Sequence, residues 1–240
     1  MNRLLLLAFS SLVIFSSCHF FHGEHIKGTG NVISQARSFS NFSGVDVSSS
    51  IDLYLKQDSS FSVKVETDDN LQQYVLIKVE NGILKIKLPD NTSLDETGKL
   101  KVYVSAPLFK SMSASGACNI FSENALISGE PVTIDLSGSC DVRLDLKAPK
   151  ISADLSGACN VMLKGEAKEF FVEGSGSSAI KCFDLMTEQT KIDISGSGEA
   201  EVFASVKLDI QTSGSSDVKY KGNATVSQDI SGSGSVKKVD

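Results

Sequence analysis

Acidic residues recur in the C-terminal half of the chain at steps of 19 to 20 residues, at Asp135, Asp154, Glu173 and Asp193. If successive copies stack as neighbouring strands, these carboxylates lie about 4.8 Å apart and repel one another. A divalent cation would bridge such neighbours, because Ca²⁺ takes several oxygen ligands. The favoured alternative is a solvated outer face without metal. Glycosidases also use two carboxylates, but so many pairs here meet that distance that none is specific.

Three cysteines share this period, at Cys118, Cys140 and Cys159, each two residues after a glycine. Stacked cysteines in an exported protein fall within disulfide range, although three thiols cannot all pair. The favoured alternative is a small turn residue, because serine or glycine fills the same position in later copies. Cys182 falls in an apolar column and is expected to face a core.

Histidine-dependent chemistry has little support in the sequence. The three histidines are His19, His22 and His25, all before the β-rich region. We interpret their segment as a tether rather than a metal site, since no further ligand cluster completes it. A cysteine or serine nucleophile needs a histidine nearby. The sequence therefore predicts no catalytic residue and no cofactor.

The period behind these columns is a Ser-Gly dipeptide that recurs seven times. Apolar and polar residues alternate on both sides of each copy, as in half-buried strands. One period cannot bury its own apolar face, so stacked copies must share a core, and glycine at the corner indicates a positive φ. The sequence predicts an all-β fold with a parallel β-solenoid over residues 111–240, with a β-propeller as the rival. The repeat glycines are Gly116, Gly138, Gly157, Gly176, Gly196, Gly214 and Gly232.

Two expectations concern the limits of this repeat. Polar exceptions in its apolar columns fall mainly in the first and last copies, which are therefore expected to be end rungs. Residues 28–110 form a less regular β-rich part, with a soft boundary to the repeats near residues 107–112. Within it, residues 75–88 are predicted to form a hairpin, because Asn81-Gly82 favours a type I′ turn.

The N-terminal residues are typical of a targeting signal. Residues 1–17 contain an apolar run, 4–15, that is too short to span a bilayer. Cys18 follows two small residues, as in a bacterial lipobox, and is expected to be acylated and to anchor the protein in the outer membrane. Residues 18–27 form the tether. The formal charge of −6 argues against nucleic acid as a partner.

Three segments of the chain resemble a known family. They are residues 28–32 (GTGNV), 37–57 (RSFSNFSGVDVSSSIDLYLKQ) and 63–88 (VKVETDDNLQQYVLIKVENGILKIKL). Together with the Ser-Gly repeats, they look like the putative auto-transporter adhesin, head GIN domain family of exported Bacteroidetes proteins. The resemblance covers residues 28–240. It implies a right-handed β-helix-like fold and an envelope or cell-surface location, and it carries over no catalytic residues.

These observations favour a non-enzymatic envelope lipoprotein, facing the periplasm or the cell surface, whose solenoid presents a polar face to glycan or protein. The alternative is a carbohydrate-active enzyme on a β-helix scaffold. The last repeat ends close to Asp240 and leaves an edge that pairs with another strand unless it is protected. We expect either self-association through this edge or protection by Lys237, Lys238 and Asp240.

Overall fold

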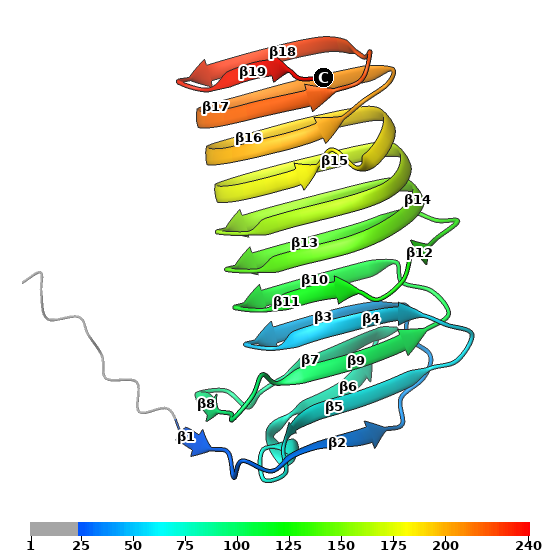
Figure 1. Cartoon of the computed structure of the whole chain (residues 1–240), viewed down its shortest axis with the longest axis vertical. Coiled ribbons are helices and arrows are strands. Elements are labelled where there is room, and N and C mark those ends of the chain that lie inside the picture. Colours follow the sequence, from blue (N-terminus) through cyan, green and yellow to red (C-terminus); the bar gives the residue numbers. More distant parts are fainter. Residues whose placement is uncertain (1–23) are drawn as a thin grey trace, which may run out of the picture.

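A computed structural model describes residues 24–240. Over this range it contains β-strands and one short 3₁₀ turn, η1 (Gln72–Tyr74), but no α-helix. Figure 1 shows the strands stacked into one elongated column, with the N-terminal strands at one end and β18 and β19 at the other. Successive repeats pair in parallel and in register. The predicted parallel β-solenoid is confirmed.

Each coil consists of two segments joined at a Ser-Gly corner, as in β13 (Val132–Gly138) and the first part of β14 (Asp141–Gly157). We call the stacked segments that run into these corners face A, and those that leave them face B. Alternate side chains point inward: Ile134 and Leu136 on face A and Val142 on face B are buried, whereas their neighbours are half-buried or exposed. The alternation thus places one side of each face in a shared core.

The long strands are β14, β15 (Asn160–Cys182), β16 (Leu185–Phe203) and β17 (Lys207–Lys221), followed by the shorter β18 (Thr225–Gly232) and β19 (Ser235–Lys238). β15, β16 and β17 each run through a Ser-Gly corner from face A to face B. β14 and β15 also continue around the edge of the solenoid opposite the Ser-Gly corners, where each ribbon curves from face B of one coil to face A of the next (Figure 1). We call this opposite side the far edge.

The seven repeat glycines all have positive φ, between 91° and 127°, as the sequence predicts. They also lie directly on one another, because Gly116 pairs with Gly138 and Gly138 with Gly157. A Cβ added to Gly138 would lie 2.5 Å from the carbonyl oxygen of Gly116. The corner therefore needs glycine for two reasons, its backbone conformation and the closeness of the coil beneath.

One coil of the solenoid lies outside the recognised repeats. It is formed by β3 (Gly44–Ser49) and β4 (Asp52–Gln57), which pair in parallel with β10 (Ser111–Gly116) and β11 (Asn119–Ser122). Ser49 takes the place of the corner glycine, with φ 88°. The prediction that the first Ser-Gly copy is an end rung is therefore wrong, since β10 lies between β3 and β13.

The chain between β4 and β10 closes one end of the solenoid. We call this end, with β2, the N-terminal cap. β7 and β9 continue the stack in parallel below β3 and β4, whereas β5 is antiparallel to both β9 and β2. The strands of the cap are β2 (Val32–Arg37), β5 (Ser62–Asp68), β6 (Leu76–Glu80), β7 (Ile83–Lys87) and β9 (Lys101–Ala106).

The hairpin predicted within the cap is confirmed. β6 and β7 pair antiparallel, and both turn residues, Asn81 and Gly82, have positive φ, as a type I′ turn requires. Three short strands complete the cap and the first coils. β1 (Glu24–Lys27) pairs in parallel with β8 (Thr92–Asp95), and β12 (Leu126–Ile127) pairs with β14.

A single hydrophobic cluster runs from Phe42 to Val218, through both the cap and the coils. The last coil differs from those before it. Gln228 lies opposite the buried Ile210, and Lys238 lies opposite Tyr220. Polar residues thus occupy inward positions where the stack of the described chain ends, as in capping repeats.

Candidate functional site

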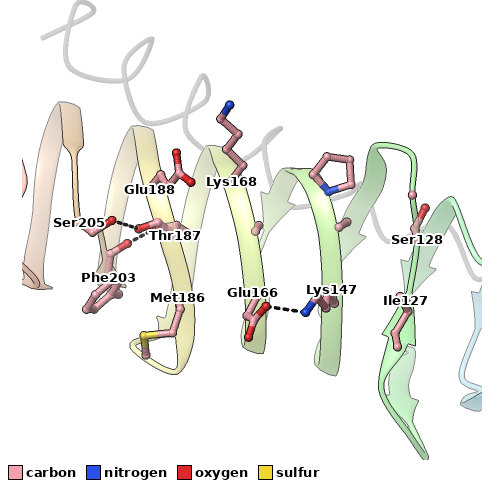
Figure 2. A pocket seen from close by; sticks show the side chains of 14 residues that line it. Ile127, Ser128, Lys147, Glu166, Lys168, Met186, Thr187, Glu188, Phe203 and Ser205 are labelled. Atoms are coloured by element: carbon pink, nitrogen blue, oxygen red, sulfur yellow. Dashed lines mark hydrogen bonds and ion pairs between the residues drawn. The ribbon is translucent and has the colours of Figure 1, made fainter.

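A groove runs along the far edge of the solenoid, across the coils from Ser128 to Ser205 (Figure 2). Its volume is about 620 Å³ and it is open to solvent. It arises where each coil turns from face B to face A, so its walls repeat once per coil. The groove therefore follows the solenoid axis rather than any one strand.

Small residues form the floor of the groove. Ser128, Ala148, Ala167 and Thr187 are each less than 9% exposed, and the last three stack in register. Because these side chains are short, the turn of each coil at the far edge lies closer to the core than the residues that flank it. The concavity thus follows directly from residue size at one position of the repeat.

Two rims flank this floor. Along one rim, Ile127, Lys147, Glu166 and Met186 stack in register. Lys147 and Glu166 form an ion pair at 2.8 Å, while Ile127 and Met186 are 55% and 45% exposed. Figure 2 shows these side chains in a row, with Lys168 and Glu188 on the other rim. Each rim therefore carries one basic and one acidic residue.

The hydroxyl groups at the groove are engaged within the protein. Thr187 Oγ1 donates to the Phe203 carbonyl and lies 2.7 Å from Thr190 Oγ1. Ser205 Oγ donates to the Thr187 carbonyl at 3.1 Å, and Ser128 Oγ donates to the Glu130 carbonyl at 2.8 Å. The floor consequently presents methyl groups and bonded backbone rather than free hydrogen-bonding groups.

The predicted acidic column is brought together on face A. Asp135, Asp154, Glu173 and Asp193 lie in register on successive coils. Partial burial, and then the neighbouring carboxylate of Asp154, raise the pKa of Asp135. Within residues 24–240, no group of three or more His, Cys, Asp or Glu side chains is arranged to hold a metal ion.

The three stacked cysteines lie at the Ser-Gly corners and point inward. Cys118, Cys140 and Cys159 are fully buried with free thiols. The Cys140 Sγ lies 3.8 Å from the Gly116 carbonyl of the coil beneath, and Ser216 Oγ similarly donates to the Gly196 carbonyl at 3.3 Å. Burial raises the pKa of Cys118 to about 11 and that of Cys182 to about 12. Buried thiols with raised pKa are poor nucleophiles.

Face B carries a column of stacked planar side chains on its outer side. The rings of Tyr103 and Tyr54 lie 5.0 Å apart, and those of Tyr54 and Phe121 lie 5.2 Å apart. The guanidinium of Arg143 continues the column, 5.9 Å from the Phe121 ring, and the Lys64 ammonium lies 4.3 Å from that of Tyr103. This column of Tyr103, Tyr54, Phe121 and Arg143 is the ring ladder.

Beside the ring ladder, acidic and amide residues pair between coils. Asn119 Nδ2 donates to Asp52 Oδ1 at 2.6 Å, and Asn160 Nδ2 donates to Asp141 Oδ1 at 2.6 Å. Two shallow depressions, of about 210 and 240 Å³, lie on either side of Arg143 and Met162. Face B therefore offers flat rings, a guanidinium and amide groups side by side.

The predicted features of the N-terminal segment lie mostly outside the described residues. Cys18, the predicted lipid anchor, lies outside the described residues, as do His19 and His22. His25 lies in β1, exposed, with its Nδ1 3.4 Å from the Ser93 carbonyl. Within residues 24–240 there is no helix long and apolar enough to cross a membrane.

Comparison with known proteins decides the family. The model of the putative auto-transporter adhesin, head GIN domain family matches residues 41–224. The chain belongs to this family. The resemblance seen in the sequence is thus confirmed, and membership in an adhesin family indicates an envelope or surface protein. No curated protein matches the chain in sequence.

Solved structures of other proteins share this fold. A putative adhesin from Bacteroides fragilis has a TM-score of 0.84 at 21% identity, covering 89% of this chain and 100% of its own. A putative lipid binding protein from Parabacteroides distasonis has a TM-score of 0.74 at 23% identity, covering 90% and 100%. A putative adhesin from the same organism has a TM-score of 0.70 at 26% identity, with the same coverage.

The groove is the feature that the sequence analysis missed. Its rim varies from Ile127 to Lys147, Glu166 and Met186, so no shared residue type marks it. A signal was nonetheless present in the floor, where small residues recur at steps of 20, 19 and 20 from Ser128 to Thr187. Small residues at one inward position of the repeat, where the other inward positions hold bulky residues, indicate a local concavity.

Proposed function

We propose that the protein is a non-enzymatic lipoprotein of the outer membrane, anchored through Cys18, whose solenoid binds glycan or an envelope protein on face B. The observation that carries the proposal is the ring ladder with the paired Asp and Asn residues beside it. Flat rings and amide or carboxylate groups at a shared surface suit a polyhydroxylated or peptide ligand, which needs both stacking and hydrogen bonds.

Two further observations support this proposal. Face B extends along the stack of coils, so a polymeric ligand would meet successive members of the ring ladder about every 4.8 Å. The family is described as adhesins. By contrast, the four described cysteines are buried, and the one described histidine, His25, lies away from them in β1. Within residues 24–240, no cysteine therefore lies beside a histidine as a nucleophile lies beside its base.

Binding is tested by retention of the protein on immobilised polysaccharides. We expect Arg143→Ala to weaken binding about tenfold, because a hydrogen bond from a charged group contributes roughly 1.5–3 kcal/mol. Lys237→Ala, in the same column but on the last coil, is the matched control and is expected to bind as the wild type. Equal binding by both variants would show that the ligand does not bind at the ring ladder. Turnover of a polysaccharide would favour the enzymatic alternative.

Anchoring and orientation are tested by proteinase treatment of intact cells that make a tagged protein, with Cys18→Ala as the control. Digestion of the wild type in intact cells would support display at the surface. Protection until the outer membrane is opened would support a periplasm-facing anchor. Release of the wild type from the membrane fraction to the same extent as Cys18→Ala would contradict lipid anchoring.

A further inference from the structure

The groove on the far edge has the lining of a site for an uncharged, apolar ligand. The hydroxyls of Thr187, Ser205 and Ser128 all bond to backbone carbonyls of the protein. The floor backbone pairs in register between coils, as Ala148 does with Ala167 and Ala167 with Thr187. A polar ligand in the groove would lose its hydrogen bonds to water without regaining them from the floor.

The charges on the rims are balanced. Lys147 and Glu166 neutralise each other across 2.8 Å, and Lys168 and Glu188 lie on successive coils of the other rim. The ligand segment inside the groove therefore meets no net charge. Exposed Ile127 and Met186 offer it apolar contact, and methylene stems of lysine can cover apolar surface while their ammonium groups stay in water.

The dimensions of the groove limit the ligand to one chain. The two rims are separated by a single floor residue, so their backbones are roughly 7 Å apart. From Ser128 to Ser205 the groove spans four steps between coils, or about 19 Å along the axis. An extended alkyl chain advances about 1.25 Å per carbon, given C–C bonds of about 1.5 Å, so roughly fifteen carbons fill this length.

We propose that the far-edge groove binds the unbranched aliphatic chain of a free fatty acid, with the carboxylate in solvent at one end. A phospholipid carries two chains, for which the groove lacks width. Binding would come from burial of methylene groups against Ala148, Ala167, Ile127 and Met186, which is favourable in proportion to the apolar area removed from water. This site is separate from face B and does not depend on the function proposed for that face.

The test uses hexadecanoic acid carrying a diazirine, added to envelope membranes from cells that make the full chain. After irradiation, labelled peptides are mapped by mass spectrometry. We expect label in the segments 127–149, 166–168 and 186–205. Met186→Glu should lower this labelling about fivefold or more, because it places a charge against the apolar chain.

Met162→Glu is the matched control, since Met162 is also 45% exposed but lies on face B. Its labelling should equal that of the wild type. Equal labelling of the two variants, or label spread evenly over the chain, would overturn the proposal. If Met186→Glu fails to fold, Ser205→Trp blocks the end of the groove and should give the same loss. Labelling of the groove by a photoreactive two-chain phospholipid, without labelling by the fatty acid, would also overturn it.

Discussion

The Ser-Gly coils and the N-terminal cap belong to one stack of strands, but different interactions hold them together. In the coils, each contact recurs on the next coil, and every repeat glycine sits on the one before it. In the cap, single residues bridge segments that are distant in sequence: the buried Asp68 carboxylate accepts the Gly30 N–H at 2.7 Å and the Thr97 N–H at 2.9 Å. Stability in the coils is therefore distributed, whereas in the cap it depends on individual contacts.

A second such contact fixes the edge of the cap. The Arg37 guanidinium donates to the carbonyl oxygens of Gln72, at 2.6 Å, and of Val75. These bonds close the turn around η1 against β2. Because these contacts occur once whereas the glycine contacts of the coils recur, the two regions should respond differently to substitutions and to pH.

The largest effect is expected from the core of the coils. Phe170 is 1% exposed, so Phe170→Ala should lower the free energy of unfolding by about 3–5 kcal/mol. Phe171→Ala is the matched control, because Phe171 points outward beneath the Lys150 ammonium at 4.3 Å and should cost about 1 kcal/mol or less. Urea unfolding of both variants gives the comparison. Equal losses would mean that the alternation of the coils does not set their stability.

Since each coil contacts only its neighbours, the damage should also stay local. Hydrogen exchange of the Phe170→Ala variant should accelerate in β14, β15 and β16 and remain slow in β5, β7 and β9. Acceleration throughout the cap would show that the two regions unfold as one cooperative unit, and would remove the distinction between them.

The next largest effect concerns the corner glycines. Gly176 and Gly82 both have positive φ, at 98° and 76°, but a Cβ on Gly176 would lie 2.6 Å from the Gly157 carbonyl oxygen, whereas one on Gly82 meets nothing within 4 Å. Gly82→Ala should cost about 1–2 kcal/mol from backbone conformation alone. Gly176→Ala should cost about 1–3 kcal/mol more, the range of overpacking. Thermal unfolding of the two variants measures the difference, and similar losses would argue against the close stacking of coils.

Ser49 explains which part of the fold the sequence analysis could predict. The seven Ser-Gly corners were predictable because glycine is needed wherever one coil rests on the corner of another. Ser49 begins that column, and the element below it is β7 followed by Leu88 rather than another Ser-Gly corner. Ser49 can therefore occupy this corner. Because it is not a glycine, the coil of β3 and β4 does not match the Ser-Gly pattern.

The cap and the groove were harder to predict for different reasons. The hairpin of β6 and β7 is local, so Asn81 and Gly82 identified it. The pairing of β2 with β5 and the contacts of Asp68 join distant segments through single residues, which leave no periodic signal. In the groove, the residue types of the rim vary from coil to coil, and only the small size of Ala148, Ala167 and the other floor residues recurs. A search for recurring polar residues therefore does not detect the groove.

A pH effect of opposite sign is expected in the two regions. Hydrogen bonds from the N–H groups of Thr97 and then Gly30 lower the pKa of Asp68 below its usual value. Stability from Asp68 is therefore present above the unfolded-state pKa, about 3.9, and is lost as pH falls through the lower folded-state pKa. On face A, burial and Asp154 raise the pKa of Asp135, so protonation of Asp135 relieves its repulsion with Asp154 as pH falls.

Acidification should consequently loosen the cap before the coils. Hydrogen exchange measured from pH 5 down to pH 2.5 should accelerate first in β2, β5 and the segment around Thr97. Asp68→Asn should make the cap less stable at pH 5 and abolish most of its further change below that pH. If the coils open first, or if Asp68→Asn leaves the acid response intact, the assignment of this response to Asp68 is wrong.

The smallest effect is expected from a comparison of the two ends of the stack. At one end the cap covers the first coils; at the other, Gln228 and Lys238 take two inward positions of the last coil, while Val226 and Val236 take others. Polar groups at an open edge oppose strand pairing with another copy. We therefore expect protection rather than self-association, with a monomer in light scattering.

Removal of residues 230–240 should expose Val218 and Tyr220 and give concentration-dependent association, because both contact the core beneath the last coil. Gln228→Ile with Lys238→Val should do the same more weakly, since it restores an apolar edge without removing the strands. Lys237→Gln is the control, because Lys237 lies in the outward column opposite Lys219. A wild type that associates on its own would show that the last coil is an interface rather than a cap. Monomers throughout would mean that the polar residues at this end are not what keeps copies apart.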